Sequence, residues 1–178
     1  IANASAASTT IVTNGRYSIR ANFAGNSSIP PGINYTETEV EALIIVLVND
    51  ERQQFDLSTL SEDSLLTSLA REHSISMVEN NFFGHERYPG ERDFTYETAP
   101  GTMRGENLAK MPTRQYIPGP YLTLQELCEW AVSGWMNSTG HRANILEPRF
   151  TETGVGVSFS EEGDFVYVYI TQIFEGAY

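Results

Sequence analysis

The sequence predicts an α+β fold, with helices in about the first three quarters of the chain and a sheet at its end. Three stretches, Val40–Val48, Leu66–Met77 and Leu124–Trp135, place apolar residues at helical spacing. Two strands close the chain, Gly154–Ser160 and Phe165–Phe174, and in the second of them apolar side chains alternate onto both faces. Since a sheet with two apolar faces must be covered on both sides, we expect helices above and below it.

The starts of the three helices are marked by capping sequences. Thr36 and Glu39 have the spacing of a capping box, in which each side chain bonds the backbone of the other residue. The third helix begins in the same way at Thr123 and Glu126, and Ser61 is the expected cap of the second. The sequence thus predicts where each helix begins as well as which face it buries.

Two places between these elements are predicted to be irregular. Residues 84–104 are polar, contain two prolines and three glycines, and resemble a long loop of the kind that is often functional. Gly140 is expected to end the third helix, which would place His141 just past a rigid element.

Residues 1–36 differ from the rest of the chain and are predicted to form an extension to a domain of residues 37–178. Asn14-Gly15 separates two short alternating segments, which predicts a β-hairpin within residues 8–24. A lone hairpin is marginal in water, so its apolar face must dock on something. Gly25–Gly32, which contains two prolines, is typical of a linker.

Composition excludes some classes of partner. The chain has 23 acidic and 11 cationic residues, a net charge of −12, which disfavours binding to nucleic acid. No apolar run is long enough to span a membrane, and a first residue other than Met suggests a processed product. The single cysteine, Cys128, lies on an apolar helical stripe, which favours a buried hydrophobic role over a reactive thiol.

Glycosylation sequons indicate export. Three of them, at Asn3, Asn26 and Asn34, fall within the first 36 residues, in a region rich in Ser, Thr and Asn. This clustering predicts a secreted or cell-surface glycoprotein.

Few residues can carry chemistry. His85 and His141 each follow a glycine, and Glu106 follows the long polar segment. Two imidazoles and a carboxylate can hold Zn²⁺ with an open position for water, or they can simply hydrogen-bond helix ends and loops. His73 lies within the apolar stripe of the second helix, which favours a hydrogen-bonded core histidine over a ligand.

Seven segments, in order along residues 37–175, resemble the CAP superfamily of cysteine-rich secretory, antigen 5 and pathogenesis-related 1 proteins. They are Val46–Arg52, Ala70–Ser74 with Met77, Asn81–His85, Gly105–Ala109, Gly134–Leu146, Gly154–Val157 and Thr171–Phe174. The likeness is greatest to the cysteine-poor prokaryotic SCP-like extracellular branch. The resemblance implies a three-layer α-β-α sandwich with a small antiparallel sheet, export, and a central cleft.

In that cleft, members of the family carry two histidines and two acids, and some bind zinc. His85 and His141 match the histidines and Glu106 the first acid, which makes zinc the candidate cofactor and Glu106 the candidate catalytic base. The second acid falls on Ser138, which cannot supply an anionic oxygen. Ser138 also makes Asn137 a sequon, and since a glycan there would collide with the cleft, we predict that Asn137 is unmodified.

The favoured function is a secreted CAP-domain protein with a binding or structural role. The hairpin suits strand addition to a neighbouring copy, which predicts a self-assembling extracellular subunit, in a filament or at a surface. The residues expected to make this contact are Ile11, Val12, Tyr17, Ile19 and Phe23. Two alternatives stay open: a metal-dependent hydrolase with a His/Glu/His cleft, and binding of an apolar ligand or lipid.

Overall fold

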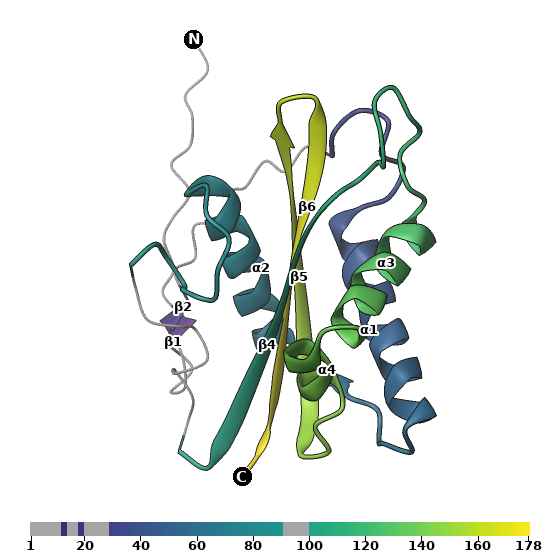
Figure 1. The fold of residues 1–178 in the computed structure, drawn as a ribbon. Helices are drawn as coiled ribbons and strands as arrows, with labels where there is room; N and C mark the ends of the chain where they lie inside the picture. Colours follow the sequence, from purple (N-terminus) through teal and green to yellow (C-terminus); the bar gives the residue numbers. More distant parts are fainter. Residues whose placement is uncertain (1–11, 14–17, 20–28, 91–99) are drawn as a thin grey trace.

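The computed structural model describes residues 29–90 and 100–178, together with the backbone of residues 12–13 and 18–19 (Figure 1). Its elements are, in order, β1 (Val12–Thr13), β2 (Ser18–Ile19), α1 (Glu37–Gln54), β3 (Ser61–Glu62), α2 (Ser64–Glu79), β4 (Thr102–Pro112), α3 (Leu124–Met136), α4 (Thr139–Ile145), β5 (Phe150–Glu162) and β6 (Phe165–Ala177). No helix in this described part of the chain is long and apolar enough to cross a bilayer.

The main sheet has the strand order β3-β5-β6-β4. The three long strands pair antiparallel, as the family resemblance implies for the sheet, and β3 adds a two-residue parallel pairing to β5 that the sequence did not indicate. Helix α2 covers one face of the sheet, while α1, α3 and α4 cover the other (Figure 1). The predicted three-layer α-β-α sandwich is therefore confirmed.

The core lies mainly between the sheet and the α1–α3 layer. The apolar stripes predicted from periodicity supply it, with Val40, Ile44 and Val48 from α1 fully buried against residues of α3 and β5. Cys128 is also fully buried here, and burial raises the pKa of its thiol to about 12, which confirms a hydrophobic role. A smaller cluster joins α2 to the opposite face through Leu66, Leu69, Ala70 and Ile173.

Two of the three predicted helix caps are confirmed. Thr36 forms a reciprocal capping box with Glu39, and Thr123 forms one with Glu126. The third prediction is wrong, because Ser61 belongs to β3 and pairs with β5. Asp63 caps α2 instead, with its Oδ1 accepting the backbone N–H of Leu66 at 2.8 Å.

The region between the helices is more regular than predicted. The last residues of the loop expected over 84–104 belong to β4, which begins at Thr102. In the middle of this strand, Gly105, Glu106 and Asn107 are not apolar, so the sequence lacks the apolar–polar alternation of a half-buried strand. Residues 91–99 of that segment lie outside the described residues. Gly140 does not end a helix: the break falls at Asn137 and Ser138, and Gly140 and His141 belong to the short helix α4.

Of the extension, the structure describes residues 29–36 and the backbone of the two hairpin strands. β1 pairs antiparallel with β2, with Val12 opposite Ile19 and Thr13 opposite Ser18, so the two segments do pair as a hairpin. A two-residue turn at Asn14-Gly15 would instead place Thr13 opposite Arg16, so the register differs from the one that this turn predicts. The turn itself, the predicted contact residues Ile11, Tyr17 and Phe23, and the sequons at Asn3 and Asn26 lie outside the described residues. Asn34 is exposed and therefore accessible to a glycan.

Candidate functional site

A buried carboxylate joins two histidines on the α2 side of the sheet. Glu106, on β4, contacts His73 of α2 through Oε2 and His85 of the following turn through Oε1, each at 2.8 Å from the ring Nδ1. The side chains of Glu106 and His73 are fully buried, whereas that of His85 is 48% exposed. Glu106 and His85 are candidates predicted from the sequence, and His73 occupies the hydrogen-bonded core position predicted for it.

The hydrogen bonds of His73 constrain the protons in this cluster. Its Nε2 lies 2.9 Å from the carbonyl oxygen of Glu86, which can only accept, so Nε2–H donates. The 2.8 Å contact between His73 Nδ1 and Glu106 then requires one more proton, carried by either group. In both arrangements the buried pair is neutral overall, and one proton lies between His73 Nδ1 and Glu106 Oε2.

Local backbone geometry presents His85 to this carboxylate. Helix α2 ends at Glu79 with Asn80 as its C-cap; Asn81 then adopts a left-handed φ of 50°, and the N–H of Phe82 bonds back to the carbonyl of Met77. This is a common way to end a helix and turn the chain sharply. It places Phe83 and His85 beside the edge of β4.

On the other side of β4, two asparagines fix the helix that carries His141. Asn144 of α4 donates from Nδ2 to the carbonyl of Glu106 and to Oδ1 of Asn107, at 3.1 and 3.0 Å. Asn107 donates in turn to the carbonyl of His141 at 3.1 Å. A Cβ on Gly105 would lie within 3 Å of Asn144 Oδ1, so the glycine allows this close approach. The two asparagines are site residues that no local sequence pattern indicated.

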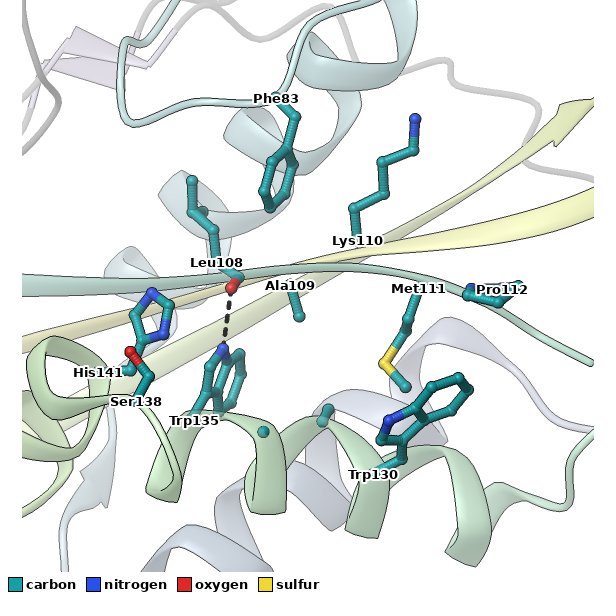
Figure 2. A pocket seen from close by; sticks show the side chains of 12 residues that line it. Phe83, Leu108, Ala109, Lys110, Met111, Pro112, Trp130, Trp135, Ser138 and His141 are labelled. Carbon is teal, nitrogen blue, oxygen red and sulfur yellow. Dashed lines mark hydrogen bonds between the residues drawn. The ribbon is translucent and has the colours of Figure 1, made fainter. Parts of the chain in front are cut away.

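His141 and Ser138 line a groove between β4 and α3, here called the β4–α3 groove, of about 440 Å³. Figure 2 shows the edge of β4 with Phe83 on one side of it and Trp130 and Trp135 on the other. The indole of Trp135 is buried and donates from Nε1 to the carbonyl of Leu108 at 2.9 Å. Trp130 and Phe83, in contrast, are 45% and 49% exposed, so aromatic surface flanks the groove.

The residues present do not fit a zinc site. Catalytic zinc uses three protein ligands with a water in the fourth position. His85 and His141 supply two nitrogens, the oxygens of Glu106 are engaged by histidine rings, and Ser138 offers only a hydroxyl. Within residues 29–90 and 100–178, no group of three His, Cys, Asp or Glu side chains is arranged to hold a metal ion.

Asn137 is not directed into the groove. It is the C-cap of α3, its side chain is exposed, and its Nδ2 donates to the carbonyl of Ser133 at 2.9 Å. The collision that we expected between a glycan and the cleft is therefore not supported by the structure. That Asn137 carries no glycan stays a prediction, but a collision with the cleft no longer supports it.

Comparison with known families agrees with the fold. Residues 45–174 match the model of CAP, the cysteine-rich secretory protein family, and the chain belongs to this family. "Uncharacterized protein YkwD" of Bacillus subtilis (strain 168) is 37% identical over 124 residues, which cover 65% of this chain and 41% of YkwD. "Uncharacterized membrane protein YlbC" of the same strain is 35% identical over 124 residues, 68% of this chain and 32% of YlbC. The chain thus spans less than half the length of either relative.

Solved structures show the same architecture. An extracellular protein containing an SCP domain from Bacillus anthracis str. Ames has a TM-score of 0.54 at 29% identity, and the match covers 78% of this chain and 40% of that one. An outer surface protein from Borrelia burgdorferi has a TM-score of 0.56 over 81% of this chain and 97% of that one. At 18% identity, the second likeness shows the fold alone. The bacterial relatives confirm the prokaryotic branch of the family.

His141 is expected to titrate below its ordinary pKa of 6.5, because burial disfavours the imidazolium and the nearby His85 adds repulsion. Because the unfolded chain then binds more protons, His141 lowers stability as the pH falls through 6.5 toward the pKa of the folded state. His85→Gln removes only the repulsion, so the pKa of His141 should rise and still stay below 6.5. Ring-proton NMR titration measures this shift, and an unchanged pKa would show that the two rings do not interact.

Proposed function

We propose that this protein is an extracellular CAP domain that acts by binding, and that its N-terminal segment, residues 8–24, joins copies of the chain into an assembly. The observation that carries the binding role is the β4–α3 groove, whose half-exposed aromatic residues flank a strand edge. Exposed aromatic side chains beside a groove are typical of sites for partners or ligands. The extracellular location is supported by the sequons and by the printed title of the Bacillus anthracis relative.

The chemistry of the cluster favours binding over hydrolysis. A general base must accept a proton from water or substrate. Glu106 is buried, both of its oxygens contact histidine rings at 2.8 Å, and it shares a proton with His73. Its better supported role is to hold α2, β4 and the His85 turn together. A metal-dependent hydrolase is therefore the less supported alternative.

Self-association is supported by the composition of the extension. Tyr17, Ile19 and Phe23 alternate with polar residues, so an extended chain would present one apolar face. In the described residues, β1 and β2 pair only with each other and form a sheet separate from the main one. A two-stranded sheet of this kind gains stability only when its apolar face packs against a further surface.

Sedimentation velocity of the full chain over a range of concentrations tests this proposal. We expect oligomers whose size grows with concentration, and Ile19→Asp should weaken association about tenfold or more, because it places a charge in an apolar contact. Ser18→Asp is the matched control, since it adds the same charge on the polar side of the segment. A full chain that stays monomeric at every concentration, or equal effects of the two substitutions, would contradict the proposal.

A further inference from the structure

The edge of β4 is open at Lys110. The N–H of Thr113 bonds to the carbonyl of Val166 of β6. Along an antiparallel strand, every second residue bonds the neighbouring strand through its backbone. The backbone groups of odd-numbered residues of β4 therefore bond to β6, and those of even-numbered residues face outward from the sheet. The outward carbonyls of Glu106 and Leu108 accept hydrogen bonds from Asn144 and Trp135. Lys110 is the next outward position, and within the described part of the chain no hydrogen bond reaches its backbone on that side.

We propose that the open edge of β4 at Lys110 is the acceptor site for the N-terminal segment of a second copy, which adds to the main sheet as a further strand. The inference rests on the proposed self-association and names the surface that receives the segment. Main-chain hydrogen bonds would supply affinity, and the aromatic side chains beside the edge would select the apolar face of the incoming strand.

The side chains around this edge suit an extended, partly apolar strand. Figure 2 views the edge with Trp130 and Met111 on the α3 side and Phe83 on the α2 side. The side chain of Lys110 is drawn back over the sheet, where Nζ bonds Glu162 at 2.8 Å and lies above the rings of Tyr167 and Tyr169. The charge that would otherwise protect an edge strand is therefore held by partners within the chain.

Charge complementarity favours the N-terminal segment of a second copy as the strand that docks at the β4 edge. Residues 1–36 contain Arg16 and Arg20 and no acidic residue, a charge of +2. All 23 acidic residues lie in residues 37–178, against 9 cationic ones, a charge of −14. Two of these acids, Glu126 and Glu129, line a hollow that meets the β4–α3 groove at Trp130. The extension of one copy is thus attracted to the body of another, whereas two bodies repel.

Crosslinking of two full-length single variants tests the site. Ile19→Cys and Lys110→Cys are mixed and treated with a short bismaleimide, while the native Cys128 stays inert because it is fully buried. We expect at least about ten times more crosslinked dimer than in a mixture of Ile19→Cys with Gln54→Cys, an exposed control on α1. Equal yields in the two mixtures would overturn the inference.

A second pair of variants acts through the backbone. Lys110→Pro removes an N–H that faces the open edge and is not part of the β4–β6 ladder, so the fold should tolerate it. Lys110→Gln removes the same charge and keeps the N–H. We expect Lys110→Pro to weaken association about tenfold or more and Lys110→Gln to leave it near the wild-type value.

The outcomes separate the two proposals. If Ile19→Asp abolishes association while Lys110→Pro and the crosslinks behave like their controls, the acceptor site is wrong and self-association stands. If the wild-type chain does not associate, the proposed function itself fails. A third measurement uses a single chain that carries both Ile19→Cys and Lys110→Cys. If the bismaleimide crosslinks these two cysteines within one molecule, so that the product has the mass of a monomer at all dilutions, docking between copies is also overturned.

Discussion

Gly156→Ala is expected to destabilise the protein by about 3 kcal/mol or more and to lower its melting temperature by about 10 °C. Strand β5 presents Gly154 and Gly156 to helix α2, and a Cβ on Gly156 would overlap with the helix backbone at Ala70 and Arg71. Since backbone atoms within a helix cannot move aside singly, the whole of α2 would have to shift away from the sheet.

The two glycines match the repeat of the helix that they face. Residues two apart on a strand are separated by about 6.8 Å, and residues four apart on a helix by about 6 Å. Gly154 accordingly faces Leu66 and Thr67, and Gly156 faces the next turn of α2. The same approach lets Ser74 Oγ donate to the carbonyl of Gly156 at 2.9 Å and brings His73 to Glu106. A shift of α2 would therefore loosen the buried cluster as well.

Urea unfolding followed by circular dichroism measures this effect. Gly134→Ala is the matched control, because Gly134 lies within α3 and a Cβ there has no neighbour within 4 Å. Alanine is favoured over glycine inside helices, so this variant should be unchanged or more stable by up to about 1 kcal/mol. A wild-type unfolding midpoint for Gly156→Ala would show that α2 does not lie directly on β5.

The elements that follow local rules were predictable from the sequence. The apolar stripes of α1, α2 and α3 and the capping boxes at Thr36 and Thr123 depend on neighbours three or four residues away, and the structure confirms them. The two closing strands were also found, although β5 and β6 extend further than expected. Such features depend on residues close together in the sequence.

Strand β4 and the connections of the site depend on residues far apart in the sequence. Gly105, Glu106 and Asn107 resemble a polar loop, yet they are buried, because His73 and Asn144 satisfy them across the fold. These contacts span more than 30 residues, so no local pattern announces them. The resemblance to the CAP family identified Glu106 and His141, but only the structure shows that His73 completes the cluster.

Arg52→Met is expected to destabilise the protein by about 3 kcal/mol or more, although Arg52 lies far from the groove. The side chain is 0% exposed, and its guanidinium donates only to backbone carbonyls. Nε bonds Ser58 at 2.8 Å, Nη1 bonds Ile145 and Glu147 at 2.7 and 2.9 Å, and Nη2 bonds Phe150 at 3.2 Å. One residue of α1 thus holds the end of α4 and the start of β5.

Methionine reproduces the apolar stem of arginine but ends short of the guanidinium, so Arg52→Met removes the donors and leaves a small void in their place. Each buried carbonyl that loses its donor costs about 1–3 kcal/mol, and the losses are not fully additive. Burial lowers the pKa of Arg52, which means that desolvation opposes the charge and offsets part of the gain from these hydrogen bonds. The expected loss is therefore well below the sum over four carbonyls.

The same urea experiment measures this loss, with Arg149→Met as the matched control. Arg149 bonds Glu147 at 2.7 Å from a side chain that is 54% exposed, and ion pairs this exposed contribute little to stability. Arg52→Lys should fall between the two, since its three donors on one nitrogen cannot reach four carbonyls in separate directions. If Arg52→Met and Arg149→Met lose the same stability, water must replace the guanidinium, and the junction of α1, α4 and β5 is held by packing alone.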